Sequence, residues 1–175
     1  MSRNRLARLN TDGSLDLTFD PGAGVTGNIY SVSLLPNGNT AIAGPMYNYN
    51  GVATPSQIAV VLPTGQLDPV FNLTSASLSG YYVNGIRAAA DGSMYLANEN
   101  NFYRFAADGT ILASAACNGT TTRAQPLPNG NVIVTCNNYS GFKLYTSDLT
   151  LIGNYGTFAT KNGWGRVYTV TPLND

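Results

Sequence analysis

The sequence predicts an all-β, propeller-like fold made of four-stranded antiparallel blades, with three full blades and incomplete strands at both ends. The prediction depends on two hairpins that alternate along the chain. The outer hairpin, an apolar run on each side of a tight turn, occurs at 5–19, 58–71, 102–115 and 142–153. The inner hairpin occurs at 31–44, 85–98 and 123–136. A repeat of roughly 40–50 residues that carries two hairpins is typical of propeller blades.

The turns of the inner hairpins explain why the chain reverses at these points. Their sequences are Pro36-Asn37-Gly38, Ala90-Asp91-Gly92 and Pro128-Asn129-Gly130. Asn-Gly and Asp-Gly pairs adopt the positive φ angles that two-residue hairpins need, and a preceding proline helps to end the strand. The residues at 29–35 and 132–136 alternate with the two-residue period of a strand. No window has the spacing of an amphipathic helix, so we expect helix to be nearly absent.

The repeat predicts a single domain, 1–175, that begins and ends within a blade. A partial blade covers 1–20, with strands near 4–9 and 14–19. Full blades follow at about 28–71, 81–115 and 121–153, and the chain ends with one innermost strand at 166–173. Exposed strand edges of this kind need cover. Another copy, another protein or the rest of a longer chain completes the sheet, or the repeats form an open arc on a larger assembly.

Two connections between the predicted strands are long and rich in aromatic residues. The first, 44–56, contains Tyr and Asn, and the second, 153–164, carries the single Trp of the chain. Variable loops on a repeated frame are common recognition sites, and aromatic rings beside Asn suit a sugar ring or a protein interface. The alternative is that these rings pack between blades, and for Trp164 the two interpretations are evenly matched. The candidate partner-binding residues are Tyr47, Tyr49, Asn50, Tyr139, Tyr155 and Trp164.

The charge composition disfavours two classes of partner. Lys and Arg together number 9, as do Asp and Glu, so the net charge is zero and only 10% of the residues are charged. This neutral surface offers no counterion release on nucleic acid and no basic patch for anionic lipid. The sequence shows no signal peptide and no transmembrane segment. Low charge with abundant Asn, Thr and Tyr favours a virion surface or an extracellular location, for a phage component or a fragment of a secreted chain.

Catalytic and metal-binding patterns are not evident in the sequence. The chain has no His, which excludes a Ser-His-Asp triad, and Glu99 is its single Glu. A carboxylate pair for glycoside hydrolysis therefore has little support. Asp12, Asp16 and Asp20 are spaced by four, but a hairpin separates them, so we interpret them as structural groups rather than cation ligands. We expect no enzymatic activity, no cofactor and no metal.

Arg5 and Arg8 lie on the first predicted strand, and pairing with Asp16 or Asp20 is a more natural role for them than ligand contact. The two cysteines are Cys117 and Cys136. In the repeat, Cys117 falls at the end of an outermost strand and Cys136 at the end of a second strand. These two strands are not neighbours in a four-stranded blade. We therefore favour two free thiols over a disulfide.

The segment 3–44, RNRLARLNTDGSLDLTFDPGAGVTGNIYSVSLLPNGNTAIAG, closely resembles the delta-60 repeat of predicted β-propellers. Its Asp-Gly-Ser-Leu-Asp-x-x-Phe-Asp-Pro-Gly motif and the later Tyr-Ser-Val-x-x-x-Pro-Asn-Gly motif carry the resemblance, together with Tyr49-Asn50-Gly51. The similarity is strong over 1–53, is recognisable to 71, and beyond about 80 keeps only the hairpin rhythm. It implies a propeller-like fold found in large bacterial surface proteins and in phage proteins, and it implies no catalytic residues.

These observations favour a non-enzymatic structural and interaction module. The leading hypothesis is a phage virion or tail-appendage component whose blade loops contact other subunits, further copies of itself or a host surface. The alternative is a carbohydrate-binding adhesin, or a glycan-degrading fragment, of a bacterial surface protein. A third hypothesis is an ordinary bacterial surface repeat with a scaffold role.

Overall fold

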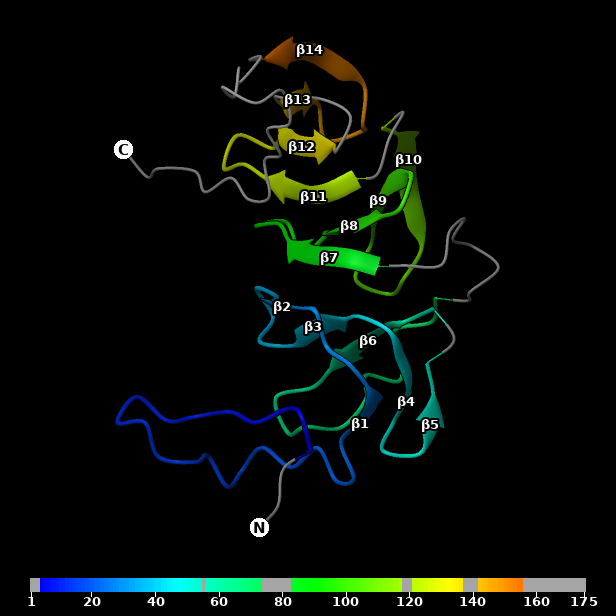
Figure 1. The fold of residues 1–175 in the computed structure, drawn as a ribbon. Helices are drawn as coiled ribbons and strands as arrows, with labels where there is room; N and C mark the ends of the chain where they lie inside the picture. Colours follow the sequence, from blue (N-terminus) through cyan, green and yellow to red (C-terminus); the bar gives the residue numbers. More distant parts are fainter. Residues whose placement is uncertain (1–3, 55, 74–82, 118–120, 137–141, 156–175) are drawn as a thin grey trace, which may run out of the picture.

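The computed structural model describes residues 4–54, 56–73, 83–117, 121–136 and 142–155. Within these ranges the chain forms fourteen β-strands and no helix (Figure 1). Accordingly, the described residues include no helix of the length and apolarity that a bilayer crossing requires. The expectation that helix is nearly absent agrees with this part of the chain.

Four antiparallel sheets contain the strands. The first sheet has the order β1-β4-β5, with β1 at Val25–Gly27, β4 at Met46–Tyr49 and β5 at Val52–Ala53. The second has the order β2-β3-β6, with β2 at Ser31–Leu34, β3 at Thr40–Ala43 and β6 at Ile58–Val61. The third runs β7-β8-β9-β10, at Val83–Ala88, Met94–Asn98, Asn101–Phe105 and Ile111–Ala116. The fourth runs β11-β12-β13-β14, at Thr121–Pro126, Val132–Cys136, Phe142–Tyr145 and Leu151–Tyr155.

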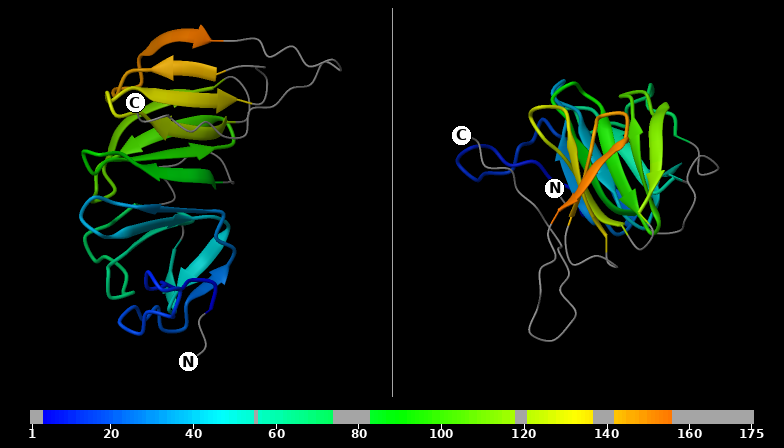
Figure 2. Two further views of the ribbon diagram at one scale, coloured as in Figure 1. Left: turned by 90° about the vertical axis from the view of Figure 1, so that its left-hand side faces the viewer. Right: turned by 90° about the horizontal axis from the view of Figure 1, so that it is seen from above.

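The sheets follow one another as a stack of blades (Figures 1 and 2). The innermost strands β2, β7 and β11 contact one another in succession on one side of the stack. This arrangement confirms the all-β, propeller-like fold class. In the part of the chain that the structure describes, the blades do not close into a ring (Figure 2).

Apolar layers between successive sheets hold the stack together. Ile58 and Val60 of the second sheet pack with Leu96 and Phe105 of the third. A second layer joins the third and fourth sheets, where the rings of Phe102 and Tyr145 meet edge to face with centroids 4.7 Å apart. Each fully buried side chain of this size contributes about 1.5–3 kcal/mol relative to an exposed one. A third layer lies between the first two sheets and the N-terminal segment.

The inner turns form as their sequences predict. Gly38, Gly92 and Gly130 have φ values of 85°, 83° and 84°. In each turn the preceding Asn or Asp side chain accepts a hydrogen bond from the amide two residues further on, as Asp91 does from Ser93 at 2.9 Å. This local bonding reverses the chain independently of its tertiary contacts.

The strands expected near 4–9 and 14–19 are not formed, and this prediction is wrong. Their pairing is limited to one bridge between Leu9 and Leu15. The Asp16 amide still donates to the Arg8 carbonyl at 2.9 Å, but the Thr18 amide donates to the Asp16 carboxylate at 2.8 Å instead of to a strand. The side chain of Asp16 thus takes the place of a backbone acceptor on the expected partner strand, and the strand pairing ends there.

The segment 44–56, which we expected to be a long connection between strands, itself contains two strands. Met46–Tyr49 and Val52–Ala53 pair as a hairpin around Asn50-Gly51, where φ is 47° and 82°, and β1 pairs on the other side. Asn-Gly is a strong hairpin turn, so local turn chemistry explains the extra sheet.

The expectation of two free thiols is wrong as well, because Cys117 and Cys136 form a disulfide with their Cα atoms 6.2 Å apart. Cys117 follows β10 and leads towards β11. Thr121 at the start of β11 is paired with Cys136 at the end of β12. The Cys117 amide donates to the Asn100 carbonyl at 3.0 Å, so Cys117 lies just past the end of β10 and within reach of Cys136, although their strands are not paired. The innermost strand predicted at 166–173 lies outside the described residues.

Candidate functional site: a cleft beside strand β6

The second sheet lacks a fourth strand because the chain leaves β6 soon after it begins to pair with it. Val61 and Leu67 form one bridge, and the Asp68 amide donates to the Val60 carbonyl at 2.8 Å. Pro69 has no N–H, and the Val70 amide donates to the Asp68 carboxylate at 2.9 Å. The strand that would cover β6 therefore ends at its first bonds.

The Asp68 side chain is held in place from a second direction. Its other carboxylate oxygen accepts a hydrogen bond from the Asn39 side-chain amide at 2.8 Å. The chain then crosses to the third sheet, where the Asn72 amide donates to the Asp108 carbonyl at 2.8 Å. Phe71, between these two attachments, packs against the apolar layer of the second and third sheets. The chain is thus fixed at Asp68 and at Asn72, and between these two residues it runs away from the edge of β6.

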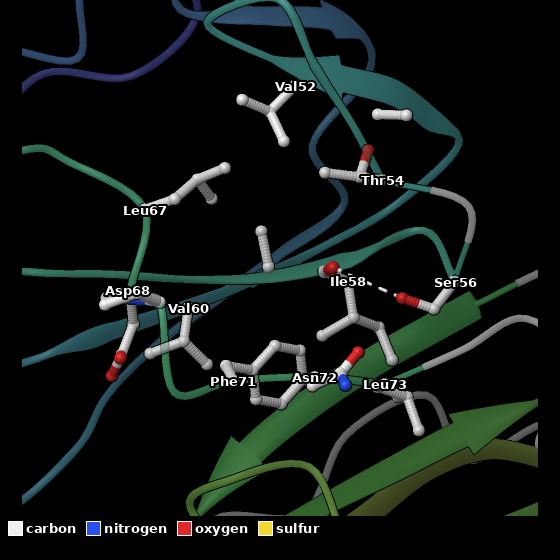
Figure 3. Close-up of a pocket in the computed structure, with 13 residues that line it drawn as sticks. Val52, Thr54, Ser56, Ile58, Val60, Leu67, Asp68, Phe71, Asn72 and Leu73 are labelled. Atoms are coloured by element: carbon white, nitrogen blue, oxygen red, sulfur yellow. Dashed lines mark hydrogen bonds between the residues drawn. The ribbon is translucent and has the colours of Figure 1, made fainter.

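A cleft of about 560 Å³ lies in the space that this diversion leaves (Figure 3). Residues 52–54 form one side, β6 forms the floor and residues 67–73 form the other side. Its apolar lining comes mainly from Val52, Ile58, Val60, Leu67, Phe71 and Leu73. This volume falls within the range of roughly 300–1,000 Å³ that is usual for ligand pockets.

The cleft also offers polar groups. The Ser56 hydroxyl donates to the Ile58 carbonyl at 3.4 Å (Figure 3). The Thr54 hydroxyl oxygen is buried without a hydrogen-bond partner. Backbone groups alternate in direction along a strand, and the Val60 carbonyl faces Asp68, so the backbone of Ile58 faces this side too. β6 is an edge strand of its sheet, and beyond the bonds to Leu67 and Asp68 the part of its outer side around Ile58 is paired with no described strand.

Two of the residues predicted from the sequence as binding residues are engaged in the fold. Tyr49 is only 1% exposed, and its hydroxyl donates to the Gly65 carbonyl at 2.6 Å. Burial, with a smaller effect from the charge of Asp20, raises the pKa of Tyr49 to about 12. The Asn50 side-chain oxygen accepts a hydrogen bond from the Ala23 amide at 3.0 Å. Tyr49 thus ends β4 and is buried, Asn50 lies in the turn that follows, and a binding role for the two stays a prediction.

The other predicted residues differ in position. Tyr47 on β4 is 71% exposed. Tyr155, at the end of β14, is 44% exposed, and its ring stacks on Phe142 with centroids 5.6 Å apart. A binding role for both stays a prediction. Tyr139 and Trp164 lie outside the described residues.

The cleft contains none of the four predicted residues that the structure describes. Sequence reasoning missed Thr54, Ile58 and Phe71, because it relied on aromatic side chains in predicted loops and none of these three residues is one. A signal was present in Leu67-Asp68-Pro69, where a proline follows the Leu-Asp step of the repeat. Proline cannot donate to a ladder, so its position marks the end of the pairing.

The Asp residues near the N-terminus act as structural groups, each accepting a hydrogen bond from an amide two residues further on: Asp12 from Ser14, Asp16 from Thr18 and Asp20 from Gly22. Arg8 pairs with Asp16 at 2.7 Å, as the sequence suggested. The Thr18 bonds and Arg8 lower the pKa of Asp16 to about 2. Within the described ranges, no three His, Cys, Asp or Glu side chains are grouped as a metal site requires.

Comparison with known proteins supports a β-propeller repeat family for the N-terminal segment. Residues 2–19 match the model of a β-propeller domain family of unknown function, DUF5122. These residues contain the Leu9–Leu15 bridge and the Arg8–Asp16 ion pair described above. No curated protein matches the chain.

Solved structures with a similar fold share little sequence with the chain. A protein of unknown function from Bacteroides caccae has 17% identity and a TM-score of 0.51, with 85% of this chain and 53% of that chain covered. A catalytically inactive virginiamycin B lyase from Staphylococcus aureus, with quinupristin, has 15% identity and a TM-score of 0.56, with 77% and 43% covered. A gluconolactonase from Xanthomonas campestris has 14% identity and a TM-score of 0.51, with 74% and 40% covered. The chain thus spans about half or less of the length of these proteins, and at such identities they show the fold alone.

Proposed function

We propose that the chain is a non-enzymatic interaction module that binds an extended, uncharged segment of a partner protein in the cleft beside β6. The observation that supports this proposal is the partly unpaired edge of the second sheet, which has three strands where the third and fourth sheets have four and which is bonded to Leu67 and Asp68 at one end alone. An extended segment can add to such an edge through main-chain hydrogen bonds, with alternate side chains entering apolar pockets.

The chemistry of the cleft supports an uncharged occupant. Among the described residues that line it, Asp68 is the only charged one, and its carboxylate is already bonded to Asn39 and to the Val70 amide. A charged side chain entering the apolar part would lose its hydration without a counter-charge. The Thr54 hydroxyl instead offers a hydrogen bond to a neutral donor or acceptor on the partner.

A phage virion or tail appendage is the setting that we propose for this module. The low charge content of 10% and the resemblance of 3–44 to the delta-60 repeat support it. The Cys117–Cys136 disulfide agrees with a role outside a reducing cytosol. The lack of His in the chain supports a non-enzymatic role, because it removes the commonest general base.

Two lysine substitutions test the cleft. Val52 lines it and is 56% exposed, so Val52→Lys places a charge there without disturbing a packed core. Val70 is 65% exposed, does not line the cleft and lies nearby in the chain, so Val70→Lys is the matched control. We expect Val52→Lys to weaken partner binding by about tenfold or more and Val70→Lys to leave it unchanged.

Binding is measured first as self-association, by sedimentation velocity of the purified chain over a range of concentrations. If the wild-type chain stays monomeric, tagged wild-type and variant chains are compared in parallel purifications from cells that assemble the native particle. Association that is lost in Val52→Lys and kept in Val70→Lys supports the proposal. Equal association of all three chains would overturn it.

A second function is favoured by the exposed aromatic rings. Tyr47, and Tyr155 stacked on Phe142, present ring faces or edges of the kind that bind sugars. A carbohydrate-binding adhesin is therefore the alternative proposal. Glycan-array binding that is abolished by Tyr47→Ala, Tyr155→Ala or Trp164→Ala would favour it over the protein-binding module. A loss of polysaccharide chain length during incubation would show instead that the chain degrades glycans.

A further inference from the structure

The innermost strands carry an unusual distribution of charge. β2, β7 and β11 lie side by side along the stack (Figure 1). Their sequences, SVSL, VNGIRA and TTRAQP, contain two arginines, Arg87 and Arg123, and no Asp or Glu. The side chain of Asn84 joins the last two strands by donating to the Thr121 carbonyl at 2.6 Å. Positive charge is therefore concentrated on two adjacent strands.

Arg87 is held by neutral groups. Its guanidinium Nη1 donates to the Ser31 hydroxyl at 3.0 Å and to the Ile86 carbonyl at 2.8 Å. Ser31 is buried and also accepts a hydrogen bond from the Ile86 amide at 3.1 Å. These bonds position the guanidinium but leave its charge without a counter-charge, because no carboxylate in the described part of the chain pairs with it.

Arg123 is even less satisfied. Its Nε atom is buried and has no hydrogen-bond partner. Burial foremost, and then the positive charge of Arg123, lowers the pKa of Arg87. A buried donor or charge without a partner costs free energy that a folded protein normally avoids. Arg104 shows the usual arrangement, since its guanidinium pairs with Asp91 at 2.6 Å.

We propose that Arg87 and Arg123 form a binding site for an oxyanion, a carboxylate, phosphate or sulfate group, on the innermost strands of the third and fourth sheets. Guanidinium groups bind such anions through two parallel N–H donors, and a bound oxygen would satisfy the Nε atom of Arg123. The ligand would also neutralise the repulsion between the two arginines. The site is separate from the cleft beside β6, whose lining contains neither residue.

Isothermal titration of the full chain tests the site, with inorganic phosphate, sulfate and glucuronate as probes at constant ionic strength. We expect saturable binding of at least one probe and a loss of affinity of about tenfold or more in Arg123→Gln. Arg104→Gln is the control, because its arginine is already paired, and its affinity for the same probe should equal that of the wild-type chain. A preference for phosphate or sulfate indicates a free inorganic or ester anion, and a preference for glucuronate indicates an acidic sugar.

Thermal unfolding without added oxyanion distinguishes a ligand-binding role of Arg123 from a structural role. Removal of a partly buried charge that has no counter-charge should leave the Tm of Arg123→Gln equal to or above that of the wild-type chain, whereas loss of a structural contact would lower it. Arg123→Lys keeps the positive charge but loses the paired N–H donors of the guanidinium, so it should bind the probe more weakly than the wild-type chain. It replaces the Gln variant in the binding test if that variant does not fold. Equal affinity of the wild-type chain and these variants, or no saturable binding of any probe, would overturn the proposal.

Discussion

Asp16 and Asp68 occupy equivalent positions in two copies of the repeat and make equivalent bonds. Each follows a leucine in a single bridge, each donates its amide to an earlier carbonyl, of Arg8 or of Val60, and each carboxylate accepts the amide two residues further on. The chain then attaches to the next outer turn, through Asp20 to Thr64 and through Asn72 to Asp108, at 2.8 Å in both cases. In both copies, strand pairing therefore ends at the Leu-Asp pair, and the chain then crosses to the next blade.

The pKa of Asp16 gives a prediction at the residue scale. Because this pKa is lowered to about 2 from 3.8, the ionised carboxylate stabilises the fold above pH 4, and this stabilisation is lost as the pH falls through about 2. The Tm difference between the wild-type chain and Asp16→Asn should therefore be largest above pH 4 and should vanish below about pH 2. A carboxyl titration of Asp16 by NMR with a midpoint near 4 would contradict this explanation.

At the scale of the elements, the Cys117–Cys136 disulfide joins the link after β10 to the end of β12. The cysteines are 19 residues apart, and closing a loop of this length stabilises a fold by about 3 kcal/mol. Reduction should lower the free energy of unfolding by about this amount in urea denaturation. The double variant Cys117→Ala, Cys136→Ala should be insensitive to the reductant. Two titratable thiols in the untreated chain would show that the bond is absent.

Local signals were sufficient for some elements and not for others. The turns at Asn37-Gly38 and Asn129-Gly130 could be predicted because their hydrogen bonds lie within the turn. The cleft could not, because it depends on the bond between Asn39 and Asp68, which are 29 residues apart in the chain. The disulfide was missed for a similar reason, since Cys117 lies past the end of β10 and is held by the Asn100 carbonyl, 17 residues earlier in the chain, rather than by strand pairing with Cys136.

At the scale of the molecule, the stack exposes apolar surface where a closed propeller would bury it. Tyr30, Val32 and Leu34 are exposed, whereas the intervening Ser31 and Ser33 hydrogen-bond to β7. This apolar row on or beside β2 and the free edge of β6 belong to the same sheet. Exposed apolar rows and free edges usually mark surfaces that a partner covers. Both features therefore support a module that is completed by another chain.

Native mass spectrometry tests this central claim most directly, on the chain isolated under non-denaturing conditions from the cells or particles that produce it. We predict that the dominant species contains the chain together with at least one partner chain, either a second copy or another protein. A dominant species with the mass of one chain, unchanged as the concentration is raised, would contradict the account.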